Sequence, residues 1–486
     1  MTTSLITSAL ATNRALMGSL SLSAWAADLE ARAAKVALFR QYVEGDHRAN
    51  LTDEMRRSLR IANKGSLNEF NVNHCAAIVE TMANRLEVSR VNADNEAAQA
   101  WVNGVLRANR FDTLQGDIHD AALRDGDTYV LVGYDNAARQ VRLYPEDAYD
   151  GVSGMIVFYS EPGVIGAAIK IWRSTTQAPG DSVRVNVYYP DRIEKYISRG
   201  MTGLDRHVVE GEEWPAAWVD KRGQPLGVPV AHFRNRAVNY ADHGLSEIEN
   251  AVPIQDALNR TLYSMVYAGE MTAFQIRYAI GIQPPAGLTP GMWIKAYASD
   301  ANGAAVEPDE TQVKWFQSIR LGAIEHGQLA PFIEMKADLM RDIYDITSTP
   351  MPGGGADAAS GESQKQREVR LLGKVRRFQL KAGQAYEDML GIAWRVQAAF
   401  GEQPAAYTTL TTRWRSADLR DDKLAVENAV KVADRVGDRE FLRMIAPVYD
   451  WSDEQIERIL TERTAEQSAK MATLTAGLPG FGNAGV

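Results

Sequence analysis

The spacing of the apolar residues changes twice along the chain, and these changes limit the folds that it can adopt. Over residues 26–106 the apolar side chains recur with helical spacing, which predicts helices. After the turn residues Arg124-Asp125-Gly126-Asp127 they alternate, so TYVLVGYD and QVRLYP are expected as strands around a loop at 136–139. Alternating segments continue to about Phe233, and helical spacing then returns. The sequence therefore predicts an α+β, mainly α protein with an embedded β-rich unit.

The return to helical spacing begins near Ser246. Ser246 and Glu249 have the spacing of a capping box, which predicts a helix start. Pro253 then either kinks this helix or marks its true first turn. A stretch rich in Gly and Pro follows at 271–322.

Strong helical patterns dominate the remainder of the chain. One helix is expected over 330–347, with Pro331 in its first turn, and a long helix over 362–400. The segment between them, STPMPGGGADAASGES, has the composition of a flexible loop. A strand is expected in TTLTTRWRS, followed by C-terminal helices, the last of them capped by Ser452 and Gln455.

Size and composition exclude several classes of protein. A chain of 486 residues predicts more than one structural unit, and it contains no apolar run long enough to span a membrane. A single cysteine, Cys75, excludes an intramolecular disulfide and fits a reducing cytoplasm, where we expect it to be a small buried apolar residue. The N-terminal segment imitates a secretion signal, but serines and Gly18 interrupt its apolar core. The net charge of -9 argues against a conventional nucleic-acid binder, although not against a protein past which DNA slides.

Motifs of enzymes are absent from the sequence. It contains no GxxxxGK[ST], HExxH, paired CxxC or GxSxG, and its seven histidines lack the spacing of metal ligands. Asp125 and Asp127 flank Gly126, but the other ligands of a calcium loop are missing, so a turn leading into the strand pair is expected. We expect no catalytic residue, no metal and no cofactor.

Four local patterns, in their order and separation, resemble the portal proteins of siphophages that infect Gram-positive bacteria. They are FRQYVEGDHRANLTDEMRRSL, DGDTYVLVGYDNAARQVRLYPED, GLSEIENAVPIQDALNRTLYSMVYAGEMTAFQIRYAIG, and TSTP with SGES before the long helix. The third is the most specific, with Asn259 where the family commonly has asparagine. Glu362-Ser363-Gln364 departs from the family, which often has apolar residues there.

The resemblance implies a portal-type ring subunit with named parts. These are a wing at 1–245, a first stem helix at 246–270, a clip at 271–322, a second stem helix at 323–347, a tunnel loop at 348–361, a long wing helix and strand at 362–415, crown helices at 416–472 and a disordered tail at 473–486. It also implies a dodecamer at the portal vertex of the virion, assembled in the host cytoplasm. The implied partners are double-stranded DNA bound without sequence specificity, the terminase large subunit, the major capsid protein and a head–tail adaptor or neck protein.

The expected second stem helix has two chemically different faces. One face carries the apolar residues Leu329, Phe332, Ile333, Leu339, Met340, Ile343 and Ile346, and the other carries the acidic residues Glu334, Asp338, Asp342 and Asp345. In a monomer the acids would form an ordinary solvated face. In a ring they would stack as negative bands along a channel and repel the DNA backbone.

The resemblance also points to a channel constriction and to partner-binding residues. The tunnel loop contributes Thr349, Pro350, Met351, Pro352, Gly353, Gly354 and Gly355, of which the glycines permit rearrangement; the alternative is a plain linker. In the clip, Met292, Trp293, Trp315 and Phe316 are candidates for binding a partner, or for a small local core. The long helix carries the cations Lys365, Arg367, Arg370, Lys374, Arg376, Arg377 and Lys381, which we expect to pair between subunits rather than contact DNA.

Two other classes of protein remain as alternatives. The first is another head–tail connector or minor head protein, which would form a ring without the stem and clip. The second is a hydrolase, favoured only by the size of the chain and its many carboxylates. Particle images separate them, because an enzyme would be compact and a connector would have a central hole.

Overall fold

We describe the chain from a computed structural model. It places residues 22–47, 72–174, 182–199, 205–208, 213–236, 243–273, 277–280, 298–299, 305–307, 309–323, 329–351, 361–402, 404, 406–417, 422–449, 451 and 453–476. In these segments, no helix has the length and apolar character that crossing a membrane requires.

The N-terminal part is mostly helical, as predicted. It contains α2 (Leu22–Glu44), α4 (His74–Ala83), α5 (Glu96–Ala108) and α6 (Phe111–Asp125). Asn73 and Asn95 cap α4 and α5 by accepting hydrogen bonds from the backbone N–H groups of Ala76 and Ala98. The purely helical prediction is wrong at β1 (Val88–Ala93), which pairs antiparallel with the distant β15 (Leu410–Trp414). A strand this short takes its stability from a partner that local spacing does not reveal.

Two sheets form the β-rich unit. The first contains β2 (Asp127–Asp135) between β10 (Val230–Arg234) and β3 (Gln140–Asp147), which confirms the predicted strand pair and its loop. The second runs β4 (Gly154–Glu161), β5 (Val164–Ser174), β6 (Ser182–Tyr188), β7 (Arg192–Arg199) and β8 (Asp205–Arg206), with β9 (Ala216–Ala217) also on β7. Gly126, with a φ of 90°, ends α6 and directs the chain into β2.

The long helix α10 (Gly361–Phe400) packs against the first sheet and forms the main core with it. Tyr386 of α10 is fully buried, with its ring in contact with Phe111 of α6 and Phe233 of β10. Cys75 is fully buried in the same core, as predicted, and burial raises the pKa of its thiol to about 12. We call the part of the chain built around this core the body.

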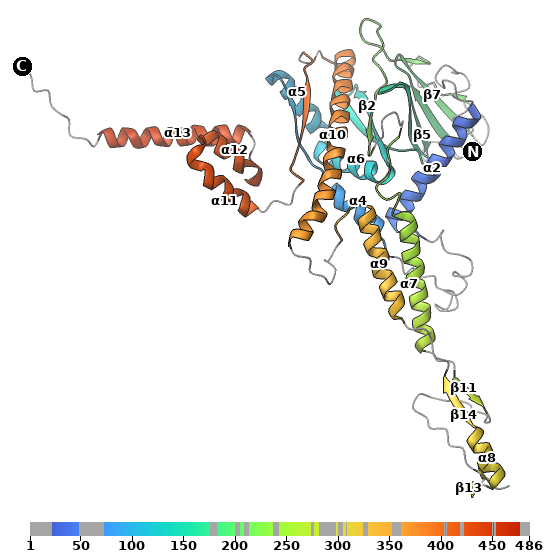
Figure 1. Cartoon of the computed structure of the whole chain (residues 1–486). Helices are drawn as coiled ribbons and strands as arrows, with labels where there is room; N and C mark the ends of the chain where they lie inside the picture. Colours follow the sequence, from blue (N-terminus) through green and yellow to red (C-terminus); the bar gives the residue numbers. More distant parts are fainter. Residues whose placement is uncertain are drawn as a thin grey trace, which may run out of the picture.

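A helical hairpin extends from the body. It consists of α7 (Val252–Ala273) and α9 (Ala330–Ile346), which lie side by side (Figure 1). At its far end are two antiparallel strand pairs and α8 (Glu310–Ser318); the pairs are β11 (Arg277–Ile280) with β14 (Arg320–Ala323) and β12 (Ala298–Ser299) with β13 (Ala305–Val306).

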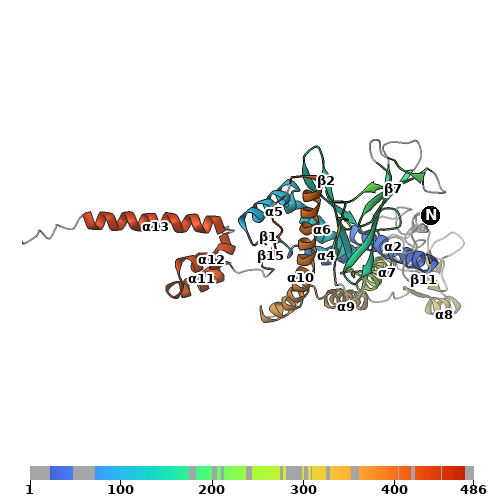
Figure 2. The ribbon, with the colours of Figure 1, turned by 90° about the horizontal axis from the view of Figure 1, so that it is seen from above.

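The C-terminal helices have a small core of their own. They are α11 (Asp422–Val432), η3 (Ala433–Arg435), α12 (Asp438–Tyr449) and α13 (Asp453–Ala476), and they lie apart from the sheets in Figures 1 and 2. Leu442 and Ile445 of α12 pack against Ile456 of α13. Residues 473–476 of the predicted tail continue α13, and the remainder of that tail lies outside the described residues.

The predicted capping box at Ser246 is wrong. The Ser246 hydroxyl donates to the carbonyl of Arg124 at 2.6 Å and accepts from the N–H of Ile248 at 3.2 Å. Glu249 instead pairs with Lys35 of α2, with the two charged atoms 3.0 Å apart. The helix begins only at Val252, so Pro253 lies in its first turn rather than at a kink.

Candidate functional site

The predicted acidic face of α9 is exposed. Glu334, Asp338, Asp342 and Asp345 all reach solvent, and Asp338 pairs with Arg341 on the same helix. Ile343 and Tyr344 are buried on the opposite side. Pro331 occupies the first turn, as predicted.

The predicted apolar face of α9 is only partly correct. Ile333 and Ile346 are 56% and 51% exposed, and Met335 is 49% exposed. They are exposed because α9 buries only the side that packs against α7 and the body. A single chain thus leaves apolar side chains beside the carboxylates in water.

The chain is tightly held where α9 ends. Ser348 adopts a left-handed φ of 51°, which turns the backbone so that the N–H of Thr349 donates to the carbonyl of Tyr344 at 2.9 Å. Thr349 is buried, while Pro350 and Met351 are half-buried. Pro352, Gly353, Gly354 and Gly355 lie outside the described residues. The first residues of the predicted tunnel loop are therefore fixed to the body.

Lys374 of α10 joins both helices of the hairpin to the body. Its ammonium group donates to the carbonyl of Thr347, after α9, at 2.6 Å. The same group pairs with the carboxylate of Glu247, before α7, whose side chain is 1% exposed. Asn235 donates to the other oxygen of that carboxylate at 3.0 Å. We call Lys374, Glu247 and Thr347 the stem junction.

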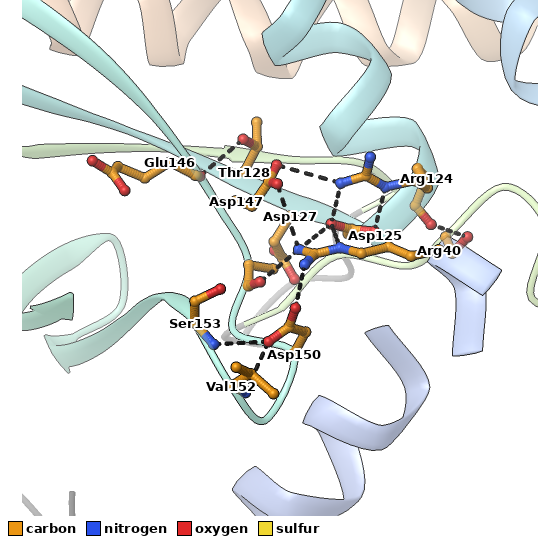
Figure 3. Close-up of polar contacts among 12 residues, drawn as sticks. Arg40, Arg124, Asp125, Asp127, Thr128, Glu146, Asp147, Asp150, Val152 and Ser153 are labelled. Carbon is orange, nitrogen blue, oxygen red and sulfur yellow. Dashed lines mark hydrogen bonds and ion pairs between the residues drawn. The ribbon is translucent and has the colours of Figure 1, made fainter. Parts of the chain in front are cut away.

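A second ionic cluster is centred on Asp125 (Figure 3). It lies beside the stem junction, because the N–H of Glu247 donates to the carbonyl of Leu123 at 2.9 Å. Arg40 of α2 and Arg124 of α6 both donate to this buried carboxylate, each at 2.8 Å from a terminal guanidinium nitrogen. Arg40 also binds Asp150 at 2.7 Å and the carbonyl of Ala148 at 2.7 Å. The cluster ties α2 and α6 to the loop that follows β3.

Asp127 holds the segment that leads into α7. Its carboxylate pairs with Arg32 of α2, is hydrogen-bonded to His232 at 2.8 Å and accepts from the N–H of Gly244 at 2.8 Å. Burial alone would raise the pKa of Asp127, but His232, Arg32 and the Gly244 N–H lower it to about 2. Asp127 is therefore ionised at neutral pH and fixes the base of the hairpin.

Sequence reasoning missed the ionic clusters around Asp125 and Asp127. Asp125 and Asp127 were predicted only as parts of a turn, but Asp125 ends α6 and Asp127 begins β2. Their partners include residues of α2, β10 and the segment before α7. The available signal was a pair of aspartates at the boundary between a helix and a buried strand.

Only some of the residues predicted to bind a partner in the clip lie within the described residues. Trp315 is 45% exposed on α8, and its carbonyl accepts from the hydroxyl of Ser318 at 2.6 Å. Phe316 lies on the same helix, whereas Met292 and Trp293 lie outside the described residues. Over the segments that the structure places, no group of three or more His, Cys, Asp or Glu side chains is arranged to hold a metal ion.

A model of the family "Phage portal protein, SPP1 Gp6-like" matches residues 24–469. The chain belongs to this family. It is 24% identical to the portal protein of Mycobacterium phage D29 over 334 residues, which cover 66% of this chain and 63% of that protein. It is 27% identical to the portal protein of Mycobacterium phage L5 over 209 residues, or 41% of each chain. The chain thus spans less than two thirds of the length of these relatives.

Two solved structures are also similar to the chain. One is described as the virion of a native gene transfer agent particle, with a TM-score of 0.40, 14% identity, and coverage of 81% of this chain and 94% of that chain. The other is the neck of an empty particle of this type, with a TM-score of 0.41, 12% identity and the same coverage.

Proposed function

We propose that this portal-family chain forms a ring at one vertex of a phage capsid and that double-stranded DNA passes through the ring. The observation that carries the proposal is the helical hairpin of α7 and α9, in which the exposed side of α9 is acidic and partly apolar. Ile333, Met335 and Ile346 remain in water in a single chain, and packing against a neighbouring copy would bury them.

The acidic face of α9 lines the channel in this proposal. Ring symmetry repeats Glu334, Asp338, Asp342 and Asp345 around the central axis. Like-charged walls repel the phosphate backbone, so the DNA has no preferred register and slides with little friction. The sequence of the DNA plays no part in this interaction.

The loop at 348–361 forms the constriction of the channel. Thr349 and the stem junction anchor its beginning, and its glycines allow the remainder to rearrange as the DNA advances. Movement at the constriction can then reach α7, α9 and α10 together, because Lys374 of α10 contacts Thr347, which follows α9, and Glu247, which precedes α7.

The other regions contact the partners of the ring, which is a dodecamer at the portal vertex of the virion, assembled in the host cytoplasm. The wing contacts the major capsid protein. The clip, with Trp315 exposed on it, binds the terminase large subunit during packaging and then a head–tail adaptor or neck protein. The chain has no catalytic role, and the terminase supplies ATP hydrolysis.

A packaging reaction with purified components tests this proposal. The protein alone should hydrolyse no ATP, and adding it to the terminase large subunit and DNA should raise ATP turnover. ATP turnover by the isolated chain that a point mutation in it abolishes would contradict the proposal.

A further inference from the structure

The first half of α10 has an exposed face with the chemistry of a protein-binding surface. Val369 and Leu380 are 64% and 67% exposed, and Gly373 between them has open space where a side chain would be. Arg370, Arg376, Arg377 and Lys381 are exposed around these residues. Among the residues that the structure describes, the side chains of these four cations form no ion pair and no hydrogen bond. We call these seven residues the basic face.

A complementary face lies on α4 and α6. Asp112, Asp117 and Asp120 are exposed on α6 around Gly116, which also has open space where a side chain would be. The pKa of Asp120 is raised, first by the partial desolvation of its carboxylate and then by the charges of Asp117 and Glu80, and Arg124 only partly opposes this. Within the described segments, no cation forms an ion pair with Glu80, Asp112, Asp117 or Asp120. We call these five residues the acidic face.

The helices that carry the two faces meet in the core of the body. His119 of α6 contacts α10 through its hydrogen bond with the Tyr386 hydroxyl at 2.9 Å and its ring contact with Phe378. The buried sides of α6 and α10 therefore meet in the core, and both faces lie on the exposed sides of these helices. Arg377 precedes Phe378 and Lys381 follows it by three residues, so the C-terminal part of the basic face lies near this contact.

We propose that the basic face of one copy packs against the acidic face of the next copy around the ring. A contact between two different faces is head-to-tail, and such a contact closes into a ring when the rotation between copies permits. Each glycine lets the partner approach the helix backbone closely. A second copy fits the basic face better than DNA does, because Val369 and Leu380 would gain nothing from a phosphate backbone. This inference rests on the proposed ring.

Charge reversal on each face tests the contact. Variant A carries Arg377→Glu and Lys381→Glu, and variant B carries Asp117→Lys and Asp120→Lys. Sedimentation velocity should give rings for the natural chain and at least a tenfold loss of rings for A and for B alone. An equimolar mixture of A and B should regain rings of alternating copies, and so should the chain with all four substitutions.

A matched control separates the contact from a general effect of charge. Arg222→Glu with Arg458→Glu changes the charge as variant A does, at exposed residues outside both faces, and should leave the rings intact. Circular dichroism should show that A and B fold, because the substituted residues are exposed.

Each other outcome has a distinct meaning. Rings of the natural chain that persist in both A and B would overturn the paired faces but not the ring. Loss of DNA retention in A with its rings intact would assign the basic face to DNA. Failure of A and B to restore rings when mixed would also overturn the pairing. Absence of rings from the natural chain would contradict the proposed function itself.

Discussion

Replacing Lys374 by methionine removes the cation of the stem junction but keeps a similar apolar stem. The Glu247 side chain is 1% exposed, so its charge would remain buried with only the Asn235 hydrogen bond. Breaking a buried ion pair from one side costs about 3–5 kcal/mol. We therefore expect the free energy of unfolding of the body to fall by about 3–5 kcal/mol, measured by urea denaturation with tryptophan fluorescence.

Two further variants give this prediction its controls. Lys374→Met combined with Glu247→Gln removes both charges and should recover most of the lost stability. Lys470→Met, at an exposed residue of α13, should change the stability by less than about 0.5 kcal/mol. If Lys374→Met alone unfolds within about 1 kcal/mol of the natural chain, the ion pair does not hold the junction and our reasoning is wrong.

Three other perturbations test separate parts of the account. Asp338→Lys with Asp342→Lys should make DNA binding by the ring tighter and more salt-sensitive and should slow packaging; if both quantities are unchanged, this face points away from the channel. Deleting residues 353–355 should leave the mass of the ring unchanged but lower the DNA retained per capsid, and normal DNA content would make the loop a plain linker. Burial lowers the pKa of His119 to about 3. Between about pH 6.5 and pH 3 the histidine is therefore protonated in the unfolded chain but not in the folded one, so the free energy of unfolding falls as the pH is lowered. At pH 5, His119 lowers the free energy of unfolding by about 2 kcal/mol. His119→Gln should therefore reduce the slope of the free energy of unfolding against pH by about the contribution of one proton. An unchanged slope would contradict a buried neutral His119.

Local patterns in the sequence predict the elements that local interactions determine. The alternation after Gly126 gives β2 and β3, and the helical spacing gives α9 and α10. The acidic face of α9 also follows from spacing alone, because carboxylates need only solvent to be satisfied. Spacing does not predict how much of the apolar side of α9 is buried, and Ile333 and Ile346 on that side remain exposed.

Contacts between distant segments account for the errors. Ser246 has the chemistry of a helix cap, but its hydroxyl binds the carbonyl of Arg124, so the helix starts later. Lys374 belongs in sequence to the cations of α10 that were expected to pair between subunits. In the structure it is largely buried in the stem junction, while Arg377 and Lys381 are exposed. The sequence alone cannot distinguish the buried cation Lys374 from the exposed cations Arg377 and Lys381, because their burial depends on contacts between distant segments.

Electron micrographs of the purified full-length protein test the central claim most directly. We expect ring-shaped particles with a central hole, twelve-fold symmetry in averaged end views, and a projecting stem in side views that corresponds to α7 and α9. Compact particles of a single chain would contradict the account.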